Sequence, residues 1–271
     1  MNNQLKTHCL SDGRQIFCLN TQEVPVLEQQ VKEYFKHGIT VKKGDTIFDV
    51  GANIGLFSLM INDICEKQVK IFAFEPIPNV FQILQENTKS IKEIMLFQLA
   101  IGKQSHIVEM TYYPNATAIS SIYPDTTGIE QRQIAKVFKE NIHSLPFPQK
   151  LVGLLPEFAI DFLIERLSQL LYISQKVKCQ TKTLSQIVHK HSITQIDLLK
   201  IDVEKAELDV LDGIAEDDWL KIKQVVVEVH DIEHRVDKIT ALLKSHSFVV
   251  ICKQDFVLRH LNIHTIYATR K

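Results

Sequence analysis

The chain reads Thr46-Ile47-Phe48-Asp49-Val50-Gly51-Ala52-Asn53-Ile54-Gly55 where an apolar segment runs into an acidic residue and a glycine-rich turn. The apolar part predicts a buried strand over residues 46–50, and residues 56–64 predict the helix that follows. Gly51 permits a sharp turn and lets a ligand approach the backbone closely, while Gly55 lets the helix pack near the strand. This stretch therefore predicts the first strand–turn–helix unit of an α/β fold.

The rest of the chain repeats this alternation of strands and helices. Strands are expected at residues 69–74, 95–100, 107–113, 196–201, 224–229, 248–253 and 263–268, and helices at 79–89, 184–191, 206–211 and 239–245. Continuous apolar runs such as Val225-Val226-Val227 suit strands covered on both faces. The pattern predicts a doubly wound, mostly parallel sheet, and the last strand should be antiparallel because no helix precedes it.

The second expected strand ends in Phe74-Glu75-Pro76. An acidic residue at this place can accept hydrogen bonds from both hydroxyls of a ribose. Alternatively, Glu75 caps the helix that begins after Pro78. Asn53 occupies the position where a dinucleotide-binding turn has its second glycine, which disfavours a pyrophosphate ligand and a dinucleotide oxidoreductase. The two motifs together predict an adenosine-type ligand, and S-adenosylmethionine fits, with Asp49 near its positive end.

Further motifs extend this pattern: Tyr34-Phe35-Lys36-His37-Gly38-Ile39, Leu99-Ala100-Ile101-Gly102 and Leu199-Lys200-Ile201-Asp202-Val203-Glu204. Between about Tyr34 and His230, and outside the segment 114–176, the chain resembles the FkbM family of class I methyltransferases. The resemblance implies a seven-stranded Rossmann-like sheet and transfer of a methyl group from S-adenosyl-L-methionine, most often to oxygen. It departs at Lys205, where the family usually has glycine, and this bears on the local backbone and on the substrate pocket.

The resemblance also implies roles for single residues. Glu75 would hold the ribose, residues 98–100 would pass beside the adenine, and Asp202 would sit beside the methyl donor. The full set expected at the cofactor is Tyr34, Asp49, Gly51, Ala52, Asn53, Gly55, Glu75, Pro76, Gln98, Ala100 and Asp202.

Methyl transfer to an alcohol needs alignment and a group that accepts a proton. His230 is the preferred general base because its ordinary pKa lies near neutrality, and Glu204 is expected to orient it, with Glu228 behind. A histidine–glutamate pair is also what similar O-methylating domains of polyketide assembly lines suggest. The catalytic candidates are therefore His230, Glu204 and Asp202, although Glu204 could instead cap the helix that follows.

Two alternatives remain beside this interpretation. Asp202, Glu204, Glu228 and His230 are oxygen and nitrogen ligands that could hold Mg²⁺ or Mn²⁺, a reading that we do not favour. A protein that binds the cofactor without catalysis is the other, and the presence of both the binding loop and a histidine at a strand end argues against it.

The chain is predicted to be one methyltransferase domain, 1–271. Residues 1–43 form a hairpin and a helix at 24–37, residues 44–113 the cofactor-binding half, and residues 177–271 the second half of the sheet. Residues 114–176 hold five prolines and two helical stretches, 129–141 and 157–172. We interpret this segment as a helical lid insertion over the functional edge, the alternative being a decoration that fills a side core.

The insertion gives the one indication of the acceptor. Its aromatic residues and their neighbours are Tyr112, Tyr113, Tyr123, Phe138, Phe147 and Phe158. Such residues favour an apolar or extended acceptor over a bare sugar. We expect a hydroxyl of a polyketide or peptide intermediate, either free or tethered to an acidic carrier protein that Lys136, Lys139, Lys150 and Arg166 would attract. A sugar or another small metabolite is the alternative.

Composition limits the remaining classes. The 271 residues carry 31 Lys+Arg and 32 Asp+Glu, so the basic excess typical of nucleic-acid binding is missing. Five cysteines without close neighbours disfavour a disulfide framework and a cysteine zinc site, and they favour a reducing compartment. No apolar run is long enough for a membrane span, and residues 1–4 do not resemble a secretory signal. We therefore expect a cytoplasmic protein with no nucleic-acid or membrane partner, and its oligomeric state stays open.

Overall fold

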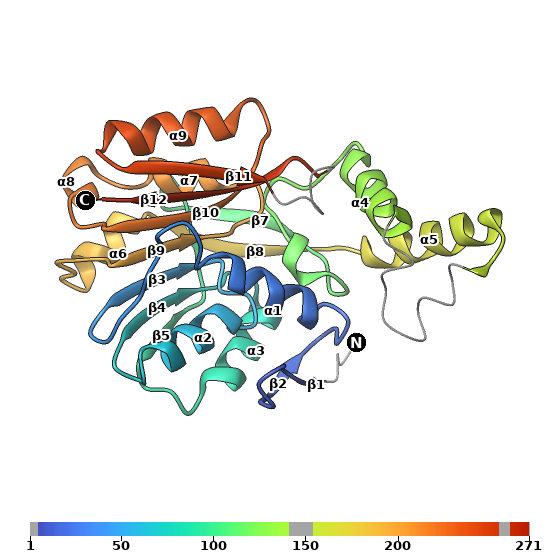
Figure 1. Cartoon of the computed structure of the whole chain (residues 1–271), viewed down its shortest axis with the longest axis horizontal. Coiled ribbons are helices and arrows are strands. Elements are labelled where there is room, and N and C mark those ends of the chain that lie inside the picture. Colours follow the sequence, from blue (N-terminus) through green and yellow to red (C-terminus); the bar gives the residue numbers. More distant parts are fainter. Residues whose placement is uncertain (1–4, 141–153, 255–260, 271) are drawn as a thin grey trace.

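The computed structural model describes residues 5–140, 154–254 and 261–270. Seven strands make the central sheet: β3 (Thr46–Val50), β4 (Lys70–Phe74), β5 (Ile94–Phe97), β9 (Leu198–Ile201), β10 (Gln224–His230), β11 (Val249–Gln254) and β12 (Ile263–Thr269). They lie in the order β11-β12-β10-β9-β3-β4-β5 (Figure 1). Only β12 runs against its neighbours β10 and β11. The predicted α/β class, with a mostly parallel sheet and an antiparallel last strand, is confirmed.

Helices cover both faces of this sheet. On one face lie α1 (Val24–Glu33), α2 (Leu56–Ile64) and α3 (Pro78–Thr88), and on the other α6 (Leu184–Lys190), α7 (Glu207–Asp212), α8 (Glu216–Trp219) and α9 (Arg235–Ser245) (Figure 1). Successive strand residues point to opposite faces. Ile47 accordingly packs in one hydrophobic core, and Phe48 and Val50 pack in the other. Two hydrophobic cores, one on each face, therefore pack against the strands of the central sheet.

A second, three-stranded sheet was not expected. It pairs β6 (Ala100–Ile101) and β7 (Ile107–Tyr112) with β8 (Gln175–Lys182), which lies between them. The expected strand 95–100 is thereby divided, because β5 ends at Phe97 and Ala100 joins β8 instead. Strand β8 begins inside the segment 114–176, so the last residues of the expected insertion belong to this sheet.

The N-terminal hairpin consists of β1 (Lys6–Cys9) and β2 (Gln15–Cys18), as the turn at Ser11-Asp12-Gly13 predicts. The insertion begins with a 3₁₀ turn, η1 (Thr117–Ile119), and then forms α4 (Ile129–Glu140) and α5 (Glu157–Leu171). These two helices pack on each other and project away from the sheet (Figure 1). Phe158 and Phe162 of α5 are 77% and 66% exposed, so the alternative that α5 fills a side core is wrong.

Within the described residues, no helix is both long and apolar enough to cross a membrane.

Candidate active site

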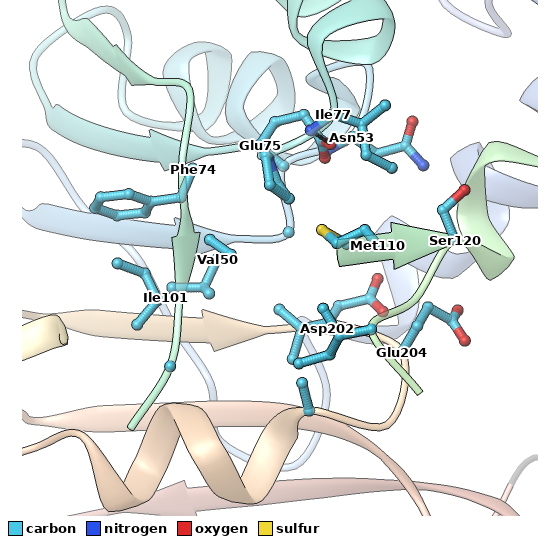
Figure 2. A pocket seen from close by; sticks show the side chains of 18 of the residues that line it. Val50, Asn53, Phe74, Glu75, Ile77, Ile101, Met110, Ser120, Asp202 and Glu204 are labelled. Atoms are coloured by element: carbon cyan, nitrogen blue, oxygen red, sulfur yellow. Dashed lines mark hydrogen bonds between the residues drawn. The ribbon is translucent and has the colours of Figure 1, made fainter. Parts of the chain in front are cut away.

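A cavity of about 490 Å³ opens at the carboxyl ends of β3, β4 and β9. This is the edge of a parallel sheet where ligands bind in α/β folds. Residues 50–54, 74–77 and 99–104 form one side of it, and α1, β7 and the segment 117–123 form the other. Figure 2 shows Glu75 and Asn53 on one wall and Asp202 with Glu204 on the facing wall. Motifs that lie as far apart in the sequence as Tyr34 and Glu204 therefore meet around one space.

The glycine-rich turn has the backbone that only glycine adopts easily. Gly51 has φ +81°, and a Cβ there would lie 1.7 Å from the carbonyl oxygen of Asp202. Gly55 has φ +96°, and its Cβ would lie 2.7 Å from a methyl carbon of Leu84. Gly51 thus lets the turn lie directly against the backbone of Asp202, whereas Gly55 lets α2 pack and does not line the cavity.

Asp49 lies beneath the turn and not in the cavity wall. Its side chain is fully buried, and it is the direct neighbour of Lys200 in the register of β3 and β9. The Lys200 Nζ lies 3.2 Å from Asp49 Oδ1 and donates to the Gly51 carbonyl at 2.6 Å. The Ser58 hydroxyl donates to Asp49 Oδ2 at 2.7 Å. The geometry differs from the expected contact with a sulfonium, because the lysine already compensates this carboxylate.

Burial works against the charge of Lys200, but Asp49 and Asp202 outweigh it and raise the pKa of the lysine. The ammonium therefore ties the end of β3, the turn and the end of β9 together. The sequence did show a signal here, since a lysine within the apolar strand segment of residues 198–201 is rarely buried without a partner.

Glu75 directly follows β4 and lines the cavity with 6% of its surface exposed. Its two carboxylate oxygens accept the backbone N–H groups of Ile77, at 2.9 Å, and Asn53, at 3.1 Å. Burial outweighs these hydrogen bonds and raises the pKa of Glu75 to about 7. Glu75 does not cap α3, whose N-cap residue is Ile77 with no side-chain cap. The carboxylate instead joins the two loops that flank the cavity.

Asp202 follows β9 and lies in the opposite wall (Figure 2). The hydroxyl of Tyr34, just after α1, donates to its Oδ2 at 2.9 Å, and Lys200 Nζ lies 3.7 Å from the same oxygen. Tyr34 is 1% exposed and packs edge-on against Phe57. The N-terminal segment thus reaches into the site, as the motif around Tyr34 implies.

Glu204 also lines the cavity, and His230 lies behind it. The His230 Nε2 is 3.1 Å from Glu204 Oε2, and its Nδ1 is 3.3 Å from Glu207 Oε1. Burial opposes a charge on the ring, but the two carboxylates outweigh it and raise the pKa of His230 well above its ordinary value. The two carboxylates thus favour the charged form of the ring. The sequence predicts that His230 faces the acceptor and that Glu204 supports it from behind. In the structure Glu204 faces the cavity and His230 supports it.

Lys205 adopts the left-handed backbone that the family's glycine would take. Its φ is +76° and that of Glu204 is +49°. The Lys205 N–H donates to Glu207 Oε1 at 2.7 Å, and its carbonyl accepts from Arg235 Nη1 at 2.7 Å. Its ammonium pairs with Glu130 of α4. The substitution therefore preserves the turn and adds a buried cation.

Three carboxylates meet beside the cavity. One oxygen each of Asp202, Glu204 and Glu228 lies within 4.8 Å of the others. Gln30 of α1 donates to Glu228 Oε2 at 2.8 Å. Burial, with Asp202 and Glu204 nearby, raises the pKa of Glu228 to about 8, so this carboxyl is mostly protonated at neutral pH.

The remaining expected residues divide into two groups. Ala52, Pro76 and Ala100 line the cavity, while Gln98 is exposed and does not. Tyr123, one of the aromatic residues expected near the acceptor, also lines the cavity, whereas sequence reasoning missed Gln30, Met110 and Thr117. These residues carry no motif, and only tertiary packing brings them to the site. The side chain of Phe138, and Phe147 and Lys150 altogether, fall outside the described structure.

Comparison with known proteins agrees with this geometry. The Methyltransferase FkbM domain model matches residues 49–250, which is well over half of the chain. The chain is also 32% identical, over its whole length and 99% of the relative, to the 31-O-demethyl-FK506 methyltransferase FkbM of Streptomyces tacrolimicus. The chain belongs to the FkbM methyltransferase family. As an FkbM-type enzyme it is an S-adenosylmethionine-dependent methyltransferase.

Other relatives differ in length. Methyltransferase sdnD of Sordaria araneosa is 31% identical over 74% of this chain and 73% of its own. The AMB antimetabolite synthetase AmbE of Pseudomonas aeruginosa is 29% identical over 96% of this chain, which spans only 12% of AmbE. A solved FkbM methyltransferase from Methylobacillus flagellatus KT has a TM-score of 0.51 at 11% identity, over 86% of this chain and 46% of that one, and shows the shared fold.

The residues present fit the cofactor that the family uses. Glu75 presents a buried carboxyl in the cavity wall, at the place where a ribose is bound in such sheets. The carboxyl groups of Asp202 and Glu204 line the facing wall, so the cavity offers polar groups on both sides of the space that a nucleoside would occupy.

Proposed function

We propose that this enzyme methylates a hydroxyl group of a natural-product intermediate. The observation that carries the proposal is the Glu204 carboxylate, which lines the cavity and is backed by His230 at 3.1 Å. When bound, S-adenosylmethionine supplies the electrophilic methyl group. Residues Gly51, Asn53 and Glu75 would hold it on one wall, with Asp202 opposite.

In this proposal Glu204 accepts the proton of the acceptor hydroxyl. His230 is a positioning residue because both of its nitrogens face carboxylates, which leaves it no lone pair for the acceptor. Once Glu204 is neutral, the imidazolium keeps its second partner, Glu207, whose other oxygen lies 3.1 Å from Arg235. The charge of the ring therefore stays compensated throughout the transfer. A positioned base of this kind contributes roughly 10²–10⁴-fold to the rate.

The acceptor class is argued from the cavity and from the relatives. Met110, Ile122 and Val31 give the cavity apolar walls away from the loop at Glu75. The relatives include a 31-O-demethyl-FK506 methyltransferase and a part of an antimetabolite synthetase. Both support a polyketide or peptide intermediate, free or carrier-bound, over a sugar. An acidic carrier protein would have to compete for the basic residues of the insertion with carboxylates that already pair with them. Lys139 pairs with Glu157 and Asp161, and Lys136 lies 3.9 Å from Glu140.

Glu204→Gln tests the assignment of the base. We expect methyl transfer to hydroxyacyl acceptors to fall by roughly 10²–10⁴-fold, because the amide accepts no proton, while affinity for S-adenosylhomocysteine stays unchanged. His230→Asn should lower turnover at least about tenfold. His234→Asn is the matched control, since His234 is exposed and lies outside the cavity lining. Full activity of Glu204→Gln would remove Glu204 from the mechanism, and cofactor binding without turnover on any acceptor would favour a non-catalytic binding protein.

A second candidate, metal-assisted O-methylation, is favoured by the cluster of Asp202, Glu204 and Glu228. Carboxylate oxygens suit Mg²⁺ or Mn²⁺, which would lower the pKa of the acceptor hydroxyl. Each carboxylate already has a partner in Lys200, His230 or Gln30, which is why we rank this candidate second. Activity lost in EDTA and restored by either ion would establish the metal-assisted route, whereas activity unaffected by EDTA supports Glu204 as the base.

A further inference from the structure

Lys205 connects two parts of the molecule that are far apart in the sequence. Its side chain is 9% exposed, and its ammonium forms an ion pair with Glu130 in the first turn of α4. Glu130 is itself only 18% exposed, and its backbone N–H donates to Asp125 at 2.7 Å. The pair is therefore a largely buried contact at the base of the insertion. Removal of one partner would leave the other charge poorly solvated.

The backbone of Lys205 belongs to the hydrogen-bond unit that holds His230. Its N–H shares the Glu207 Oε1 atom with His230 Nδ1, and its carbonyl accepts from Arg235, which also pairs with Glu207. Glu204 precedes it directly, and the Glu204 carbonyl accepts from the Ser121 hydroxyl. The turn at residues 204–207 is thus contacted by the insertion on one side and by the His230 unit on the other.

Two successive left-handed residues make this turn sensitive to its contacts. A residue other than glycine in this conformation is strained and persists only where the surrounding contacts hold it. A glycine at position 205 would relieve part of this strain but would carry no ammonium. The lysine thus keeps a strained turn and gains the contact to α4.

We propose that Lys205 is a positioning residue that couples the α4–α5 insertion to the Glu204–His230 pair. Through the ion pair with Glu130, the base of the insertion holds the turn that presents the Glu204 carboxylate to the cavity. The other end of the insertion is anchored separately, because Asn115 donates to the Leu170 carbonyl at 2.9 Å and Tyr172 packs edge-on against Tyr113. This inference rests on the proposed function for its kinetic consequence only, since the coupling itself is a property of the fold.

Hydrogen exchange in the Glu130→Gln variant tests the coupling without turnover. Glu130 contacts the turn through the Lys205 ammonium, so a merely local role would affect that side chain and α4 and leave the backbone hydrogen bond of the turn unchanged. We expect faster exchange also in residues 204–207, including the Lys205 amide that donates to Glu207. Lys139→Met is the control, because Lys139 pairs only within the insertion and should leave the turn unchanged. Unchanged exchange at residues 204–207 in Glu130→Gln would overturn the proposal.

The Lys205→Gly and Lys205→Arg variants test the kinetic consequence. Glycine suits the left-handed turn, so the protein should fold, yet kcat/KM for the acceptor should fall about tenfold or more as Glu204 loses its exact placement. Affinity for S-adenosylhomocysteine should not change, and arginine, which keeps the cation, should restore activity. Equal losses in cofactor affinity and in turnover, or full activity of Lys205→Gly, would refute the positioning role. A wild-type protein without methyl transfer would refute the proposed function, while the exchange experiment would still decide the coupling.

Discussion

At the scale of single residues, the site depends on charges that burial makes sensitive to their partners. Burial raises the pKa values of Glu75 and Glu228, whereas neighbouring carboxylates raise those of Lys200 and His230 against the effect of burial. Their identities are visible in the sequence, and Glu75 was assigned to the cofactor from its position alone. The compensation of Asp49 by Lys200 was not predicted, because it follows from the register between β3 and β9.

Cofactor binding should depend on the ionisation of Glu75. Its carboxyl has a pKa of about 7 in the folded protein, and ribose hydroxyls donate to the ionised form. We therefore expect the affinity for S-adenosylhomocysteine to rise by about tenfold between pH 6 and pH 8, measured by titration calorimetry. Glu75→Gln should bind more weakly and lose this dependence. If the variant keeps it, another group, such as Glu228, carries the effect.

Ionisation of the Glu75 carboxyl should lower the stability of the ligand-free protein, although it strengthens cofactor binding. Its pKa is higher in the folded protein, about 7, than in the unfolded chain, so the folded state holds more protons between these values. The unfolding free energy of the ligand-free protein should therefore decrease as pH rises through this window, up to about pH 7. Urea unfolding at several pH values measures this slope, which Glu75→Gln should reduce.

Lys200→Met should lower the unfolding free energy strongly, because it leaves Asp49 buried without its cation. Breaking such a pair costs about 3–5 kcal/mol of unfolding free energy. The double variant Lys200→Met with Asp49→Asn should recover part of the loss, since no uncompensated charge remains. Chemical denaturation measures both. If Lys200→Met alone is as stable as the wild type, the ion pair does not hold the turn.

At the scale of elements, local patterns predicted most of the structure. Helix α2 has the expected bounds, Leu56–Ile64, because its apolar periodicity and the preceding glycine are both local signals. Strand β8 was missed although Val177, Cys179 and Thr181 alternate with polar residues, since the long insertion before it obscured the rhythm. Helix α1 ends at Glu33, four residues before the expected end, so Tyr34 lies just beyond it.

The apolar residues of α5 offer a test at this scale. Because Phe158 and Phe162 are mostly exposed, replacing either by serine should change the unfolding free energy by no more than about 0.5 kcal/mol. Phe72→Ala is the comparison, since Phe72 is 1% exposed and its removal should cost about 3–5 kcal/mol. A large loss in the α5 variants would mean that another surface covers this face in solution.

At the scale of the whole molecule, the cavity links both halves of the sheet, the N-terminal helix α1 and the segment 117–123. A ligand held between them should stabilise the entire fold. S-adenosylhomocysteine at a hundred times its dissociation constant should add about 2.7 kcal/mol to the unfolding free energy. Differential scanning calorimetry would register this as a higher melting temperature. Gly51→Ala should abolish the shift, because its Cβ would collide with the Asp202 carbonyl.

The sequence by itself determined the α/β class, the glycine turn, the acidic residue after β4 and the family, because each is written in neighbouring residues or in a regular period. Tertiary structure alone decided that Glu204 stands between His230 and the cavity, that Lys200 compensates Asp49, and that Lys205 reaches α4. These arrangements depend on strand register and on two left-handed residues in succession. Such features are set by contacts between distant segments, and no local pattern of residues encodes them.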